Sequence, residues 1–88
     1  MLARMRKASK TLSAREVFAR NVRRARRLKD LSQESLALEL GMSRPYLSSV
    51  ERGVRNVSID NMGRLADALG VALRDLVDPE KFKGPDDV

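Results

Sequence analysis

The sequence predicts an all-α fold, a compact domain of five helices behind a basic N-terminal arm. Two observations lead to this class. Apolar residues recur at three- and four-residue spacing in several segments, and four of these segments follow a serine that can cap a helix. No stretch alternates β-branched or aromatic residues with polar ones, as a half-buried strand would. With 88 residues, the chain fits one domain with a small core.

The chain divides into a flexible basic arm over residues 1–12, a folded domain over 13–79 and a tail over 80–88. The arm has scattered small apolar residues without a sustained period. Order begins where Ser13 and Glu16 form a capping-box pattern, which opens a helix over about Ala14 to Lys29. We expect its inward face to consist of Phe18, Val22, Ala25 and either Leu28 or Lys29.

Two short helices follow in close succession. Ser32 caps the first, which ends at Gly41, and Ser43 caps the second, which ends at Gly53. An early Pro45 is tolerated because first-turn amides have no acceptor within the helix. The inward residues are Leu36, Ala37, Leu40, Leu47 and Val50. Two helices of this length with so tight a connection have the dimensions of a helix-turn-helix.

Two further helices complete the domain. Ser58 caps the fourth and Gly70 closes it. Its apolar residues are Ile59, Met62, Leu65, Ala66 and Leu69. A short fifth helix, with Leu73, Leu76 and Val77, ends before Asp78-Pro79 because proline cannot continue a helix.

The net charge of +6 is distributed unevenly along the chain. Residues 1–29 hold 11 Lys and Arg against one acid, whereas residues 30–88 hold 7 against 11. Such a basic front suits a polyanionic partner, because neutralised phosphates release their counterions. A solvated basic tail and a cleaved targeting peptide are the alternatives.

The residue types exclude much chemistry. Without Cys or His there are no disulfides, thiolate metal sites, Cys nucleophiles or imidazole bases, so we expect neither an enzyme nor a cofactor or metal. Asp60, Asp67 and Asp75 fall at helical surface spacing without a partner base. No uncharged stretch approaches the roughly 20 residues of a membrane-spanning helix, and a cytoplasmic setting is compatible.

The run from Leu31 to Gly53 resembles the Cro/CI-type (XRE-like) helix-turn-helix family of bacterial and phage regulators, and the similarity extends over about residues 18–77. Within the family, residues 43–58 are most similar to the controller proteins of restriction-modification systems, although those often carry Thr where this chain has Pro45. The resemblance implies a lambda-repressor-like fold and a transcriptional regulator that binds operator DNA.

Candidate DNA contacts fall into two groups. The residues expected to contact bases lie on the side of the third helix opposite Leu47 and Val50, and they are Arg44, Pro45, Ser48 and Ser49. Arg44 can bond O6 and N7 of a guanine through its planar fork, and a phosphate contact is its alternative. The residues expected to contact the DNA backbone are Gln33, Ser43, Tyr46, Arg52, Arg55 and Asn56. For Tyr46 the alternatives are a thymine methyl or plain packing, and for the residues after the helix an ordinary solvated loop.

The resemblance also implies a salt bridge between Arg26 and Glu51, which would hold the first helix against the motif. One module touches too few bases for useful specificity, so we expect a homodimer on double-stranded DNA. The fourth and fifth helices offer surplus apolar residues for the interface, namely Ile59, Met62, Leu65, Leu69, Val71, Leu73, Leu76 and Val77. The alternative is that all of them belong to the core.

Further partners can be weighed against the same residues. The arm residues Arg4, Arg6, Lys7 and Lys10 are candidates for phosphate contacts. An antitoxin-like or anti-repressor-like protein-interaction module of the same fold is the main alternative function. RNA is disfavoured because the deep, narrow major groove of an A-form helix excludes a protein helix. No membrane partner and no small-molecule effector are expected.

Overall fold

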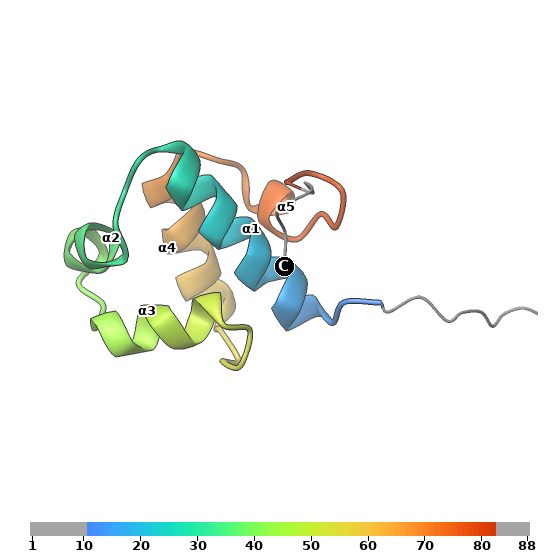
Figure 1. The fold of residues 1–88 in the computed structure, drawn as a ribbon, viewed down its shortest axis with the longest axis horizontal. Helices are drawn as coiled ribbons and strands as arrows, with labels where there is room; N and C mark the ends of the chain where they lie inside the picture. Colours follow the sequence, from blue (N-terminus) through green and yellow to red (C-terminus); the bar gives the residue numbers. More distant parts are fainter. Residues whose placement is uncertain (1–10, 83–88) are drawn as a thin grey trace, which may run out of the picture.

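Five α-helices and their connections make up the part of the chain, residues 11–82, that the computed structural model describes (Figure 1). The helices are α1 (Ala14–Leu28), α2 (Gln33–Leu40), α3 (Arg44–Glu51), α4 (Ile59–Leu69) and α5 (Leu73–Leu76). Residues 11–82 contain no strand, and the predicted all-α class is confirmed. The arm residues Arg4, Arg6, Lys7 and Lys10 and the end of the expected tail lie outside the described residues.

Serine hydroxyls open four of the helices, as their positions in the sequence predict. Each accepts a hydrogen bond from the backbone N–H three residues later, and the serines are Ser13, Ser32, Ser43 and Ser58. The first also completes the expected capping box with Glu16. Gly41 and Gly70 end α2 and α4 with φ of 67° and 70°, a left-handed conformation that costs glycine little.

The core lies where α1 crosses the other helices. α1 packs against α3, α4 and α5, while α2 packs against α3 and α4. Side chains from all five helices meet there, and the buried cluster is Phe18, Val22, Ala25, Leu36, Ala37, Leu40, Leu47, Val50, Leu65, Ala66, Leu69 and Leu76. Burial of this apolar surface is the main source of stability in so small a domain.

Three residues that the sequence pattern places at helical spacing are exposed. The stripe that α1 buries ends at Arg26, so Leu28 is 77% exposed and Lys29 is exposed as well. Ile59 is 66% exposed at the first position of α4, ahead of Leu65, the first buried residue of that helix. Neither Leu28 nor Lys29 therefore extends the inward face of α1, and Ile59 is outside the core, which leaves it available to the expected interface.

Side chains from distant helices cap the carboxyl ends of the two motif helices. A guanidinium nitrogen of Arg64, on α4, donates to the carbonyl oxygen of Leu40, the last residue of α2. Arg23, on α1, donates in the same way to the carbonyl oxygen of Glu51, the last residue of α3. No backbone N–H of the same helix donates to these carbonyl oxygens, and a cation is favoured at the negative end of the helix dipole.

The C-terminal segment is attached to α1 by a fully buried amide. Asn21 Nδ2 donates to the carbonyl oxygens of Asp75 at 3.2 Å, Leu76 at 3.0 Å and Asp78 at 2.9 Å. Arg20 Nη2 donates to the carbonyl oxygen of Pro79 at 2.6 Å. Phe82 packs half-buried against the core. None of the helices within residues 11–82 is long and apolar enough to cross a membrane.

Candidate nucleic-acid interface

α2 and α3 form a helix-turn-helix around a turn at residues 41–43. The backbone N–H of Met42 donates to the carbonyl oxygen of Ala37 at 2.9 Å, which closes the turn after the left-handed Gly41. Ala37 is 3% exposed beneath the turn, and Leu36 and Leu47 are fully buried. Small and apolar side chains at these positions fix the angle between the two helices.

The outward side of α3 carries three of the four residues expected to contact bases. Arg44 and Pro45 are exposed in its first turn, and Ser48 is half-buried one turn later. Leu47 and Val50 are buried on the opposite side, as expected. Arg52 Nη1 donates to Ser48 Oγ at 2.9 Å, which places a cation at the edge of this surface. We call Arg44, Pro45 and Ser48 the reading face.

Ser49, the fourth residue expected to contact a base, is not on the reading face. Only 7% of it is exposed, and its hydroxyl donates to the carbonyl oxygen of Tyr46 at 2.6 Å. The same hydroxyl accepts a hydrogen bond from Arg55 Nε at 3.1 Å. Ser49 therefore orients Arg55 and is covered by it, and we do not retain it as a base-contacting residue.

Tyr46 joins α3 to α4 and to the following loop. It is half-buried against the core, and its hydroxyl accepts a hydrogen bond from Asn61 Nδ2 at 3.2 Å. The guanidinium carbon of Arg55 lies 4.9 Å from the centre of its ring, within the range of a cation–π interaction. Arg52, Arg55 and Asn56 follow the carboxyl end of α3 in the sequence, and all three are exposed.

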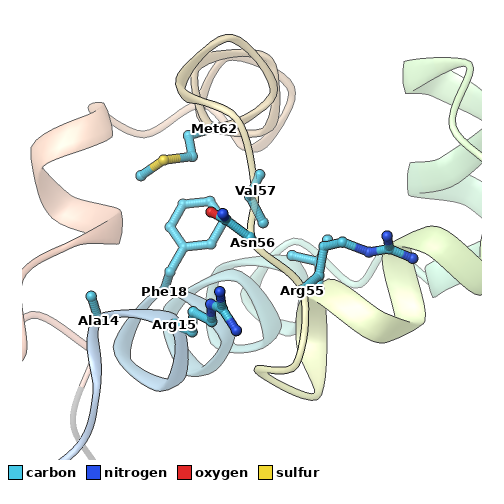
Figure 2. A pocket seen from close by; sticks show the side chains of 8 residues that line it. Ala14, Arg15, Phe18, Arg55, Asn56, Val57 and Met62 are labelled. Atoms are coloured by element: carbon cyan, nitrogen blue, oxygen red, sulfur yellow. The ribbon is translucent and has the colours of Figure 1, made fainter.

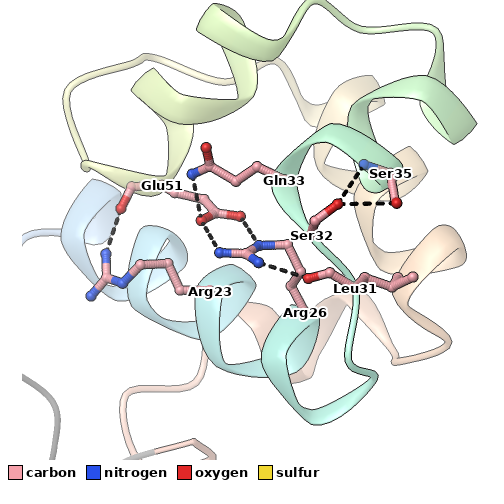
Figure 3. Close-up of polar contacts among 7 residues, drawn as sticks. All are labelled: Arg23, Arg26, Leu31, Ser32, Gln33, Ser35 and Glu51. Atoms are coloured by element: carbon pink, nitrogen blue, oxygen red, sulfur yellow. Dashed lines mark hydrogen bonds and ion pairs between the residues drawn. The ribbon is translucent and has the colours of Figure 1, made fainter.

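The ion pair expected between Arg26 and Glu51 is present. Arg26 Nε donates to Glu51 Oε2 at 2.7 Å and Nη2 donates to Oε1 at 2.9 Å, a bidentate arrangement (Figure 3). The side chains are 11% and 2% exposed. Burial removes most solvent screening from the pair, so it holds α1 firmly against the end of α3.

Glu51 connects α2 to the same point. Gln33 Nε2, at the start of α2, donates to Glu51 Oε1 at 3.0 Å, and Arg26 Nη1 donates to the carbonyl oxygen of Leu31 at 2.7 Å (Figure 3). The carboxylate thus links the first three helices. The contact of Gln33 with Glu51 was not predicted from the sequence. A carboxylate can accept more hydrogen bonds than one arginine donates to it, so a further donor was to be expected.

The basic residues of α1 have two kinds of surroundings. Arg20, Arg23 and Arg26 donate to acceptors of the protein itself, so the charge excess at the front of the chain does not all serve an external partner. Arg15 and Arg27 are exposed at opposite ends of the helix. Charge counting alone cannot separate these groups, since hydrogen bonds to distant carbonyls leave no pattern in the sequence.

Comparison with known proteins agrees with this geometry. The family model described as Helix-turn-helix matches residues 22–76. Control protein C.BamHI of Bacillus amyloliquefaciens is 46% identical over 69 residues, which are 77% of this chain and 85% of that protein.

Two solved structures are similar over most of their length. The hypothetical transcription factor NHTF from Neisseria superposes with a TM-score of 0.76 at 37% identity, covering 92% of this chain and 93% of that one. The restriction-modification controller protein C.AhdI from Aeromonas hydrophila superposes with a TM-score of 0.67 at 45% identity, covering 70% and 94%. The chain therefore belongs to the Cro/CI-type (XRE-like) helix-turn-helix family of transcriptional regulators, and restriction-modification controller proteins are among its relatives.

Proposed function

We propose that this regulator binds operator DNA as a homodimer and reads the major groove with the reading face of α3. The observation that carries the proposal is the exposed Arg44 and Pro45 and the half-buried Ser48 on the outward side of a helix whose far end is fixed by the buried Arg26–Glu51 pair. A rigidly held helix with polar outward side chains suits specific readout, because base contacts depend on orientation. Because duplex DNA is the proposed ligand, we expect the protein to act in the cytoplasm.

Each residue of the reading face has a distinct capacity. Arg44, the first residue of α3, offers a planar fork for O6 and N7 of guanine. Pro45 offers an apolar surface to a thymine methyl, and the hydroxyl of Ser48 bonds with either donors or acceptors. Arg44 and Ser48 are one turn apart on the same side of the helix, so they face neighbouring base pairs.

The residues proposed to contact the DNA backbone lie on both sides of the reading face, and they are Gln33, Ser43, Tyr46, Arg52, Arg55 and Asn56. One amide hydrogen of Gln33 is used by Glu51, and a second one remains on the same nitrogen for a phosphate. Tyr46 and Ser49 hold Arg55 in place, which lowers the entropy that a phosphate contact costs. These residues set the position of the protein and not its sequence preference.

The proposed dimer interface lies on α4 and on the segment that follows α5. Ile59 is 66% exposed and Val77 is 47% exposed, and both are apolar. A groove of about 560 Å³ is bordered by Val77, by Met62 of α4 and by Val17 of α1. Leu65, Leu69 and Leu76 are taken up by the core of their own chain. A second copy related by a twofold axis would cover the exposed pair and present two copies of α3 to the DNA.

Selection of bound duplexes from a random library tests the reading face. We expect the wild-type protein to select a symmetric site, and Arg44→Ala to lose its preference at one guanine in each half-site. The loss should amount to about 1–3 kcal/mol of discrimination per guanine, the range for a bidentate arginine contact. Overall folding should not change, because Arg44 is exposed.

The same selection distinguishes the alternative of an interaction module. If the wild-type protein enriches no sequence and its binding disappears as salt rises, the reading face does not read bases. An antitoxin-like protein that depends on a protein partner would then be the better assignment. Asp60→Ala is a suitable control, since this exposed α4 residue is not on α3.

Sedimentation equilibrium with Ile59→Asp tests the dimer interface. A carboxylate at this position would be buried twice in a symmetric interface, so we expect the dimer dissociation constant to rise by more than about tenfold. Leu38→Asp is the matched control, because Leu38 is 77% exposed on α2, away from the proposed interface. Equal association of both variants and the wild type would contradict an interface at Ile59.

A further inference from the structure

The first turn of α1 lies against the loop that follows the reading helix. A Cβ atom on Gly53 would be 3.5 Å from both Cα and Cγ of Glu16, so the two segments are in contact. A pocket of about 170 Å³ opens beside this contact, and Arg15 lines it together with Arg55 and Asn56 (Figure 2). The other lining residues are Ala14, Phe18, Val50, Val57 and Met62.

The charge of Arg15 is available to a ligand. Its side chain is exposed, and no hydrogen bond or ion pair joins it to another of residues 11–82. The neighbouring Glu16 is not paired with it, and Glu16 Oε1 instead accepts the backbone N–H of Ser13 at 2.9 Å in the capping box. Arg15 thus lines the pocket with a side chain that is accessible to solvent.

We propose that Arg15 is a further phosphate-contacting residue, which holds the same stretch of DNA backbone as Asn56 and Arg55. The inference rests on the proposed DNA-binding function. Arg15 lies on α1 beside the loop after α3 and not on the reading face, so it meets sugar-phosphate and not base edges. The guanidinium of Arg55 lies over the ring of Tyr46, and its side chain points away from those of Arg15 and Asn56 (Figure 2).

Such a contact extends the backbone surface beyond the motif itself. Arginine pairs with a phosphate through two parallel hydrogen bonds, so one residue on α1 can fix the tilt of the whole domain on the duplex. The pocket lies next to the proposed dimer groove, because Ala14 borders both. Arg15 would thus attach this end of the domain to the DNA.

Binding of the full chain to a fluorescent duplex, measured between about 50 and 200 mM KCl, tests the role of Arg15. The probes are the duplex that the wild-type protein selects and a scrambled duplex of the same composition. Arg15→Ala should reduce the slope of log K against log salt by about 0.9 on both duplexes, and Arg15→Lys should retain most of the slope. Over this salt range, one lost contact corresponds to roughly a three- to fourfold change in relative affinity.

Lys29→Ala is the matched control for the loss of one positive charge from α1. Its Nζ would be 3.7 Å from a Cβ on Gly70, so it lies at the carboxyl end of α4, far along α1 from Arg15. If Arg15→Ala and Lys29→Ala have the same slope while the wild type binds the selected duplex tightly, the role of Arg15 is overturned and the proposed function is not. If the wild type binds neither duplex, the proposed function itself fails.

Discussion

Replacing Glu51 by alanine should lower the free energy of unfolding by about 3–5 kcal/mol, the cost of leaving a buried charge without its partner. Arg26, whose side chain is 11% exposed, would lose both of its carboxylate contacts, and Gln33 would lose its acceptor. A domain of this size has few kcal/mol to lose, so the substitution should remove a large part of its stability at 25 °C. Urea titration followed by circular dichroism measures the effect.

Two control variants separate the buried charge from other causes. Glu39→Ala removes an exposed acid from α2 and should change stability by less than about 0.5 kcal/mol. The double variant Arg26→Met, Glu51→Leu replaces both charges by apolar side chains and should be more stable than Glu51→Ala. If the double variant is as unstable as the single one, the penalty comes from the hydrogen bonds of Glu51 that both variants lack and not from the unpaired guanidinium.

The double variant also separates stability from function. It should fold, but it lacks the hydrogen bonds that orient α1, α2 and α3 through one carboxylate. We therefore expect weaker and less selective DNA binding at full helix content. Native-like selectivity in this variant would mean that apolar packing alone sets the angle of the reading helix.

The helix boundaries were predictable because the signals that set them are local. A serine whose hydroxyl accepts a nearby N–H, or a glycine that takes a positive φ, needs no information from the rest of the chain. Ser32 and Gly41 bound α2 in the structure as they do in the sequence pattern. The family resemblance added the Arg26–Glu51 pair, which no helical period would have indicated.

The roles of several polar residues were not predictable because their partners are far away in the sequence. Arg64 and Leu40 are separated by 24 residues, and Arg20 and Pro79 by 59. In the sequence, an arginine that caps a distant carbonyl cannot be distinguished from an arginine that faces solvent. Ser49 shows the same limit, since polarity predicts an outward position and its hydrogen bonds instead hold it beneath Arg55.

Among the buried polar residues, Asn21 is expected to have the largest effect on the free energy of unfolding after Glu51. Asn21→Leu keeps the branched shape of the side chain but removes the donor for the carbonyl oxygens of Asp75, Leu76 and Asp78. Arg20 Nε also loses its acceptor, Asn21 Oδ1, at 3.3 Å. Because each buried polar group left unpaired costs about 1–3 kcal/mol, we expect a loss of about 2–3 kcal/mol after partial hydration of the loosened segment. Thermal unfolding followed by circular dichroism measures it, with Asn56→Leu as the exposed control.

The same substitution should also weaken the proposed dimer, because α5 and Val77 are held in place through Asn21. Sedimentation equilibrium at a temperature where Asn21→Leu is fully folded should show a raised dissociation constant, whereas Val77→Asp should raise it without loss of stability, since Val77 is 47% exposed. If Asn21→Leu loses stability but associates like the wild type, the segment that follows α5 is not part of the interface. The contacts between copies would then have to involve Ile59 and the first turn of α4 alone.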